Sequence, residues 1–170
     1  ATLRVGRKRF ELFLMPGGKL EVTINLPEIF WSESHLFGKK ENGQLIWFEG
    51  TYAALNTELV KHAGLMNIYS ADNFYENICG VTPAQYKKYV TKIYEKNRGE
   101  ILKNKSLSDA TCTYMINKLE MSYFFAIRGY KGNISYAPMI SGKKGVKRAD
   151  MTVDESYYDD ILELDFIHSP

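Results

Sequence analysis

The first fifty residues show a hydrophobic pattern with a period of two, which predicts β-strands. In residues 19–26 apolar and polar positions alternate strictly, and the apolar ones are Leu20, Val22, Ile24 and Leu26. The β-prone run 10–15 precedes this segment, and Met15-Pro16-Gly17-Gly18 supplies a proline and a glycine in the order that a tight turn needs. We therefore expect residues 10–26 to form a β-hairpin.

Two further strand candidates lie at residues 3–5 and 44–48, and the polar, glycine-bearing segment 37–43 reads as a surface loop. Residues 1–50 thus predict a small antiparallel β-sheet, a partial sandwich. So few strands leave an edge open, or covered by a neighbouring copy. The chain is already strand-like at Leu3 and begins without a methionine or a signal peptide, so we expect that further sequence precedes it.

After Gly50 the hydrophobic period changes to about 3.6, which predicts helices. One apolar stripe runs over residues 52–63 and ends at Gly64, and a shorter helix over 70–78 ends at Gly80. The best-signalled helix begins at Thr82, because Pro83 suits the first helical position and Gln85 completes a capping box.

Two more helices are expected towards the C-terminus. One is capped at Ser106 or Ser108, and its apolar face is Met115, Ile116, Leu119, Tyr123, Ala126, Ile127 and Tyr130. The last is an amphipathic helix capped by Asp154. The predicted fold is therefore α+β, with a small sheet in residues 1–50 followed by four or five packed helices in residues 51–170.

Composition limits the function classes. A chain of 170 residues is about one domain, and its 45% of apolar residues is ordinary for a globular protein. The net charge of +2 creates no global field toward nucleic acid or anionic lipid. No apolar run approaches the roughly 20 residues that span a bilayer.

The two cysteines, Cys79 and Cys112, allow two interpretations. A disulfide between them would stabilise the fold by about 3–4 kcal/mol on the chain-entropy model. Nothing in the sequence brings them together, however, and neither belongs to a Cys-X-X-Cys pair. We favour two separate thiols that pack as small hydrophobes.

No catalytic, cofactor-binding or metal-binding residue can be assigned from the pattern, and no cofactor is implied. The histidines His35, His62 and His168 lie in three different segments, without the convergent donors of a metal site. The acidic residues Asp159, Asp160, Glu163 and Asp165 alternate with apolar ones, which indicates a solvated helix face rather than an acid–base pair.

The strongest charge cluster is Lys143-Lys144-Gly145-Val146-Lys147-Arg148. It could contact phosphates, alone or together with the basic residues 4–9. A nucleic-acid site usually adds interleaved aromatics or a reading helix, and neither accompanies this run. We interpret the run as a solvated loop between the last two helices.

Two segments carry a resemblance to a known family. Residues 13–22, FLMPGGKLEV, look like a "PG-x-x-L-x-V" hairpin, and residues 48–59, FEGTYAALNTEL, look like a helix start with glycine, small residues and Leu-Asn-x-x-Leu. Both are similar to the N-terminal regions of TlpA-like thiol–disulfide oxidoreductases from Bacteroidetes-type cell envelopes. Residues 157–165, YYDDILELD, with Ser169-Pro170 resemble part of the helical region of these proteins.

The resemblance implies an exported, often lipid-anchored protein whose C-terminal thioredoxin-fold domain carries a Trp-Cys-x-x-Cys motif. This sequence has no such motif, so none of the family's catalytic residues maps onto it. The expected function is a non-catalytic accessory region in the periplasm or cell envelope. It would position the redox domain of the same protein or recognise its protein substrates.

Two other function classes stay open. One is a stand-alone envelope protein that binds a peptide or a glycan, which a concave pocket lined by tyrosine and by Trp31 or Trp47 would favour. The other is a small nucleic-acid-binding protein that uses Lys143 to Arg148, which predicts steeply salt-dependent binding.

Overall fold

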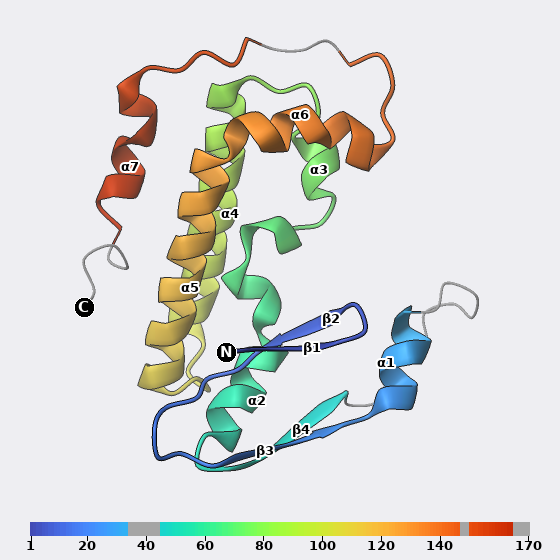
Figure 1. Cartoon of the computed structure of the whole chain (residues 1–170). Coiled ribbons are helices and arrows are strands. Elements are labelled where there is room, and N and C mark those ends of the chain that lie inside the picture. The colour runs from blue at the N-terminus through green and yellow to red at the C-terminus, as the bar shows by residue number, and fades with distance from the viewer. Residues whose placement is uncertain (34–44, 147–149, 165–170) are drawn as a thin grey trace. The chain divides into compact units, whose positions relative to one another are not determined.

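The computed structural model describes residues 1–33, 45–146 and 150–164 (Figure 1). Its packing divides the chain into two compact units, Ala1–Ala63 (unit 1) and Gly64–Pro170 (unit 2). Unit 1 contains short antiparallel strands and two helices, and unit 2 is helical. The α+β class is therefore confirmed, with two small antiparallel sheets followed by packed helices.

Each sheet of unit 1 has two strands. Strand β1 (Thr2–Val5) pairs with β2 (Lys8–Glu11), and β3 (Leu20–Ile24) pairs with β4 (Ile46–Gly50). The expected hairpin over residues 10–26 is wrong, because among the described residues β2 and β3 are not partners. Strand β2 instead closes a tighter hairpin with β1, directly before it in the chain.

The turn predicted between the two arms nevertheless forms. The Gly18 N–H donates to the Met15 carbonyl at 3.1 Å, and Gly17 has a φ of 81°. A proline in second place and a left-handed glycine in third place are typical of a type II turn. The turn therefore redirects the chain from one hairpin to the next rather than joining two paired strands.

The helix α1 (Leu26–Glu33) was not predicted. It begins after Asn25, whose side-chain oxygen accepts from the Glu28 N–H at 3.2 Å. Leu26 was assigned to a strand face, but it starts this helix and is exposed. The expected loop 37–43 lies outside the described residues.

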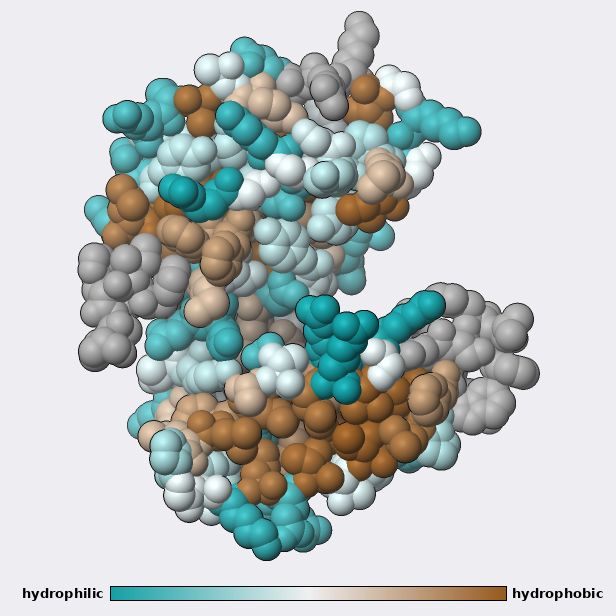
Figure 2. All heavy atoms as spheres, viewed as in Figure 1, coloured by the Kyte–Doolittle hydropathy of each residue, from teal (hydrophilic) through white to brown (hydrophobic). Residues whose placement is uncertain are grey.

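The core of unit 1 is small. Four buried side chains form one cluster, Phe10, Leu12, Ile29 and Ile46, and Leu59 is buried as well. Seven apolar side chains around them are only partly buried: Leu3, Val5, Val22, Ile24, Leu45, Phe48 and Val60. Figure 2 shows apolar side chains gathered in the lower part of the view, where β1 to β4 lie. Helix α2 (Ala53–Lys61) packs against β4 and β2, so the first predicted helix belongs to the same unit as the strands.

Unit 2 begins with short turns. Helix α2 ends before the predicted glycine, and the 3-10 turn η1 (Ala63–Met66) follows it. A second turn, η2 (Ile68–Ser70), and the four-residue α3 (Phe74–Asn77) replace the longer helix expected over 70–78.

Two long helices, α4 (Pro83–Lys103) and α5 (Asp109–Arg128), lie side by side and form the centre of unit 2 (Figure 1). The predicted capping box is confirmed, since Thr82 and Gln85 exchange side-chain and main-chain bonds at the start of α4. Ser108, one of the two expected caps, accepts from the Thr111 N–H at the start of α5.

The apolar face predicted for α5 ends one turn early. Gly129 closes α5 and opens α6 (Tyr130–Ser141), so Tyr130 belongs to the next helix. A Cβ at residue 129 would stand 2.9 Å from the Phe125 carbonyl oxygen, closer than real Cβ atoms come. Glycine therefore lets the chain turn sharply here, and α6 packs against α3.

The last predicted helix is divided into the 3-10 turn η3 (Glu155–Tyr158) and the short α7 (Asp159–Leu162). Asp154 precedes η3, but its side chain accepts from the Ser156 hydroxyl and not from a main-chain N–H. Among the helices of the described ranges, none is long and apolar enough to cross a bilayer.

Candidate functional site

Metal-ligating side chains do not converge among the described residues. Over the described residues, no group of three or more histidine, cysteine or acidic side chains is placed to hold a metal ion. His62 caps the end of α2, and His35 and His168 lie outside the described residues. Asp159, Asp160 and Glu163 are exposed, as expected of a solvated face, and Asp165 lies outside the described residues.

Cys79 and Cys112 are both free and half-buried. Cys79 lies in the turn after α3, and Cys112 in the first turn of α5. Neither thiol belongs to a Cys-X-X-Cys pair.

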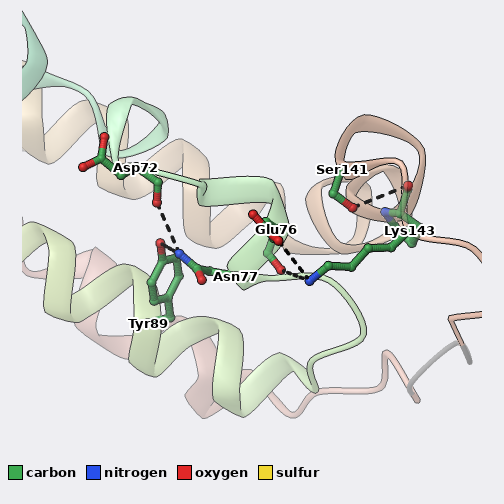
Figure 3. Close-up of polar contacts among 7 residues, drawn as sticks. Asp72, Glu76, Asn77, Tyr89, Ser141 and Lys143 are labelled. Atoms are coloured by element: carbon green, nitrogen blue, oxygen red, sulfur yellow. Dashed lines mark hydrogen bonds and ion pairs between the residues drawn. The ribbon is translucent and has the colours of Figure 1, made fainter.

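The basic run is tied to unit 2 at its first residue. The Lys143 ammonium donates to the Glu76 carbonyl at 3.2 Å and lies 3.8 Å from the Glu76 carboxylate (Figure 3). In the same view, Asn77 donates to the Asp72 carbonyl and to the Tyr89 hydroxyl, which ties α3 to α4. Lys143 is thus a C-terminal cap for α3, and Lys147 and Arg148 lie outside the described residues.

The two motifs that carry the family resemblance meet inside unit 1. Asn56, fully buried on α2, accepts from the Phe13 N–H at 2.8 Å and donates to the Phe13 carbonyl at 3.1 Å. A third bond joins it to the Tyr52 carbonyl at 2.8 Å. The ring of Tyr52 stands edge-on to Phe13, with centroids 5.4 Å apart. Asn56 belongs to the motif of residues 48–59, but that motif does not predict a bond to Phe13, 43 positions away.

Two glycines of the same motifs let neighbouring groups approach the main chain more closely than a side chain would permit. At Gly50, with φ 106°, a Cβ would stand 2.2 Å from the Lys19 carbonyl oxygen. At Gly18 it would meet the Tyr52 ring at 2.2 Å. The PG turn and the glycine before α2 are therefore positions where the main chain packs against its neighbours.

Unit 2 contains a cleft of about 960 Å³ between α4 and the segment that leads into η3. Helix α4 supplies Lys88 and Lys92 to one wall, and residues 150–157 supply Asp150 and Asp154 to the other. Tyr157 is the aromatic residue among the described residues that line it. No local pattern predicts this cleft, because its walls lie some sixty positions apart in the chain.

Exposed apolar side chains form a second surface on unit 2. Tyr136, Met139 and Ile140 lie within two turns of α6 and are exposed to 60%, 73% and 52%. Tyrosine is enriched at protein interfaces, and Tyr136 is an exposed tyrosine on this surface. The hydroxyls of Tyr86 and Tyr130 are instead used inside the unit, where they donate to the carbonyls of Ala126 and Met151.

Comparisons with known proteins add no relative. No protein-family model matches the chain, and neither the search of curated proteins nor the search of solved structures found a match. The likeness to the N-terminal regions of TlpA-like oxidoreductases stays a prediction made from the motifs.

Proposed function

We propose that this chain is a non-catalytic accessory region of a cell-envelope thiol–disulfide oxidoreductase. The observation that supports the proposal best is the junction in unit 1, where Asn56 of one motif holds the main chain of Phe13 in the other. Two motifs 43 positions apart form one structural unit, so their joint occurrence has a physical reason.

In this function the chain supplies position and recognition, and the sulfur chemistry belongs to a thioredoxin-fold domain of the same protein. Cys79 and Cys112 are not arranged as a Cys-X-X-Cys pair, so the chain brings no thioredoxin-type motif of its own. Its partners are that redox domain and the disulfide-bearing protein substrates. The location that fits this role is the periplasm or cell envelope.

The proposal is tested with the complete encoded protein and a version that lacks residues 1–170. Reduction of insulin reports a protein substrate, and reduction of a small aromatic disulfide reports the redox site alone. Deletion should raise KM for insulin while kcat/KM for the small disulfide stays the same.

Three results would contradict the proposal. The first is appreciable insulin reduction by the purified chain 1–170. The second is an encoded protein without a thioredoxin-type cysteine pair. The third is an equal loss of activity toward both substrates on deletion, which would indicate a catalytic or folding role instead.

A second candidate is a stand-alone envelope protein that binds a peptide or a glycan. The cleft of unit 2 favours it, since its volume lies within the range of about 300–1,000 Å³ found for ligand pockets. The nucleic-acid alternative is weaker, because Lys143 of the basic run is engaged with Glu76.

A further inference from the structure

One wall of the cleft carries a pair of free cations. Lys88 and Lys92 are exposed and stand one turn apart on α4, where like charges repel each other. Among the described residues neither forms an ion pair. Their neighbour Lys87 differs, because its ammonium lies 2.9 Å from the Asp160 carboxylate and 5.4 Å from the centre of the Tyr157 ring. Glu95 lies on the same wall, beyond Lys92.

The opposite wall carries two carboxylates, which accept hydrogen bonds from residues two positions further along the chain. Asp150 accepts from the Thr152 N–H at 2.9 Å and from the Thr152 hydroxyl at 2.7 Å, and these bonds lower the pKa of Asp150. Asp154 accepts from the Ser156 hydroxyl at 2.5 Å. Over the part of the chain that the structure describes, no ion pair crosses the cleft, so both walls present their charge to the space between them.

The acidic wall is extended at Asp154, where the main chain has φ −83° and ψ 175°. The two walls are joined where buried Tyr157 donates its hydroxyl to the carbonyl of buried Pro83 at 3.3 Å.

We propose that this cleft binds an extended peptide segment in which acidic and basic side chains alternate. Successive side chains of a strand point to opposite sides, so such a peptide has its acids on one side and its bases on the other. That arrangement matches a lysine wall facing an aspartate wall. Residues two apart in a strand are about 6.8 Å apart. This is close to the axial rise of about 6 Å between Lys88 and Lys92.

A ligand of one charge sign fits less well. A nucleic acid or an anionic lipid surface would pair with the lysines but would meet the carboxylates of Asp150 and Asp154 across the cleft. The inference rests on the part of the proposed function in which the chain recognises proteins, and it names the site and the chemistry of the bound segment.

The test compares two fluorescein-labelled octapeptides by anisotropy against the chain 1–170 at low ionic strength. One alternates Glu and Lys throughout, and the other has four Glu followed by four Lys. Composition and net charge are equal, but only the first separates its charges onto two sides. The alternating peptide should bind at least about tenfold more tightly. Equal affinities, or no binding of the alternating peptide at about 1 mM, would overturn the proposal.

Charge reversal locates the site. The double variant Lys88→Glu with Lys92→Glu should weaken binding of the alternating peptide by about tenfold or more. Lys96→Glu with Lys103→Glu makes the same charge change on α4 outside the cleft and should leave affinity within about twofold. Adding Asp150→Lys and Asp154→Lys to the first variant exchanges the walls and should restore binding, which a merely misfolded variant would not do. Equal losses in the two double variants would contradict the assignment.

Two further readouts separate the alternatives. Amide shifts in the NMR spectrum of the chain should move at residues 87–92 and 150–156 on adding the alternating peptide, and shifts confined elsewhere would refute the site. A single-stranded octanucleotide that binds as tightly as the peptide would replace this proposal by an anion site. None of these measurements involves disulfide reduction, so failure of the accessory function in the insulin assay is a separate result.

Discussion

Unit 1 and unit 2 keep their structure by different means. Unit 1 has one cluster of four buried apolar side chains around which seven others stay partly exposed, and among the described residues its strands are joined only in pairs. Unit 2 is built around two packed helices of 21 and 20 residues, α4 and α5. Its largest fully buried side chains include Tyr86, Ile101, Met115, Leu119 and Ile127.

The difference appears again in the polar groups. In unit 1 a single amide, Asn56, ties the loop after β2 to α2 through the main chain of Phe13. In unit 2 the hydroxyls of Tyr86 and Tyr130 donate to carbonyls inside a larger core. A small core leaves more of the free energy of unfolding to each polar bond. Unit 1 should therefore depend on particular hydrogen bonds, and unit 2 on buried area.

The two units can be followed separately. Both tryptophans, Trp31 and Trp47, lie in unit 1, so tryptophan fluorescence reports its unfolding. Far-UV circular dichroism is dominated by the long helices of unit 2. This pair of signals serves the first three tests below.

The largest expected effect is alkaline unfolding of unit 2. Burial raises the pKa of six tyrosines, all in this unit: Tyr69, Tyr86, Tyr94, Tyr123, Tyr130 and Tyr157. For Tyr94 burial and then the nearby Glu120 carboxylate raise the pKa to about 12. A tyrosine with a raised pKa stabilises the fold below its unfolded value, and that stability is lost as the pH rises through the folded pKa.

Helical dichroism should therefore fall between about pH 10 and pH 12, together with a rise in tyrosinate absorbance. About half of the twelve tyrosines should ionise only in this late step. Ionisation of all twelve near pH 10 with the helices intact would show that their hydroxyls are not held in the core.

The next effect is a cavity in the interface between α4 and α5. Leu119→Ala, at a fully buried position, should lower the free energy of unfolding by about 2–5 kcal/mol in urea denaturation followed by dichroism. Leu102→Ala is the matched control, because Leu102 is 55% exposed on α4 and should change stability by less than about 0.5 kcal/mol. A similar loss in both variants would argue against a packed interface.

A smaller loss of stability is expected in unit 1 when the bridge from Asn56 to Phe13 is weakened. Asn56→Asp keeps an acceptor for the Phe13 N–H but cannot donate to the carbonyls of Phe13 and Tyr52. It should cost about 1–3 kcal/mol in denaturation followed by tryptophan fluorescence. Thr57→Ala, which removes only an exposed bond to the Ala53 carbonyl, should be nearly neutral. A neutral Asn56→Asp would show that the bridge does not hold unit 1.

The smallest effect concerns the start of α4. Thr82→Ala removes one half of the capping box and should cost about 1 kcal/mol of stability. Thr82→Ser retains the side-chain oxygen and should restore most of it, as thermal unfolding can measure. If serine and alanine destabilise equally, the methyl group rather than the cap is responsible.

How much of this could be predicted depends on how local each signal is. The capping box at Thr82, the cap at Ser108 and the turn at Gly17 were predicted because each involves residues within a few positions of one another. Helix α1 had a comparable local signal in Asn25, a residue type that often caps a helix. The strict alternation in the residues before it nevertheless favoured a strand that continues to Leu26. The boundary between α5 and α6 was indicated in the sequence by a single glycine, Gly129.

Strand partners were not predictable in the same way. Residues 10–15 and 19–26 fit a hairpin equally well on alternation and turn chemistry, and only the pairing of β1 with β2 and of β3 with β4 decided otherwise. Alternation states which face of a strand is apolar and says nothing about its neighbour.

By itself, the sequence determined the α+β class, the long helices of unit 2 and their caps, because these follow from periodicity and from bonds between near neighbours. The tertiary structure alone decided the strand pairing, the bridge from Asn56 to Phe13, and the cleft between α4 and residues 150–157. Each of these joins residues that only the folded chain brings together, so no local pattern can encode it.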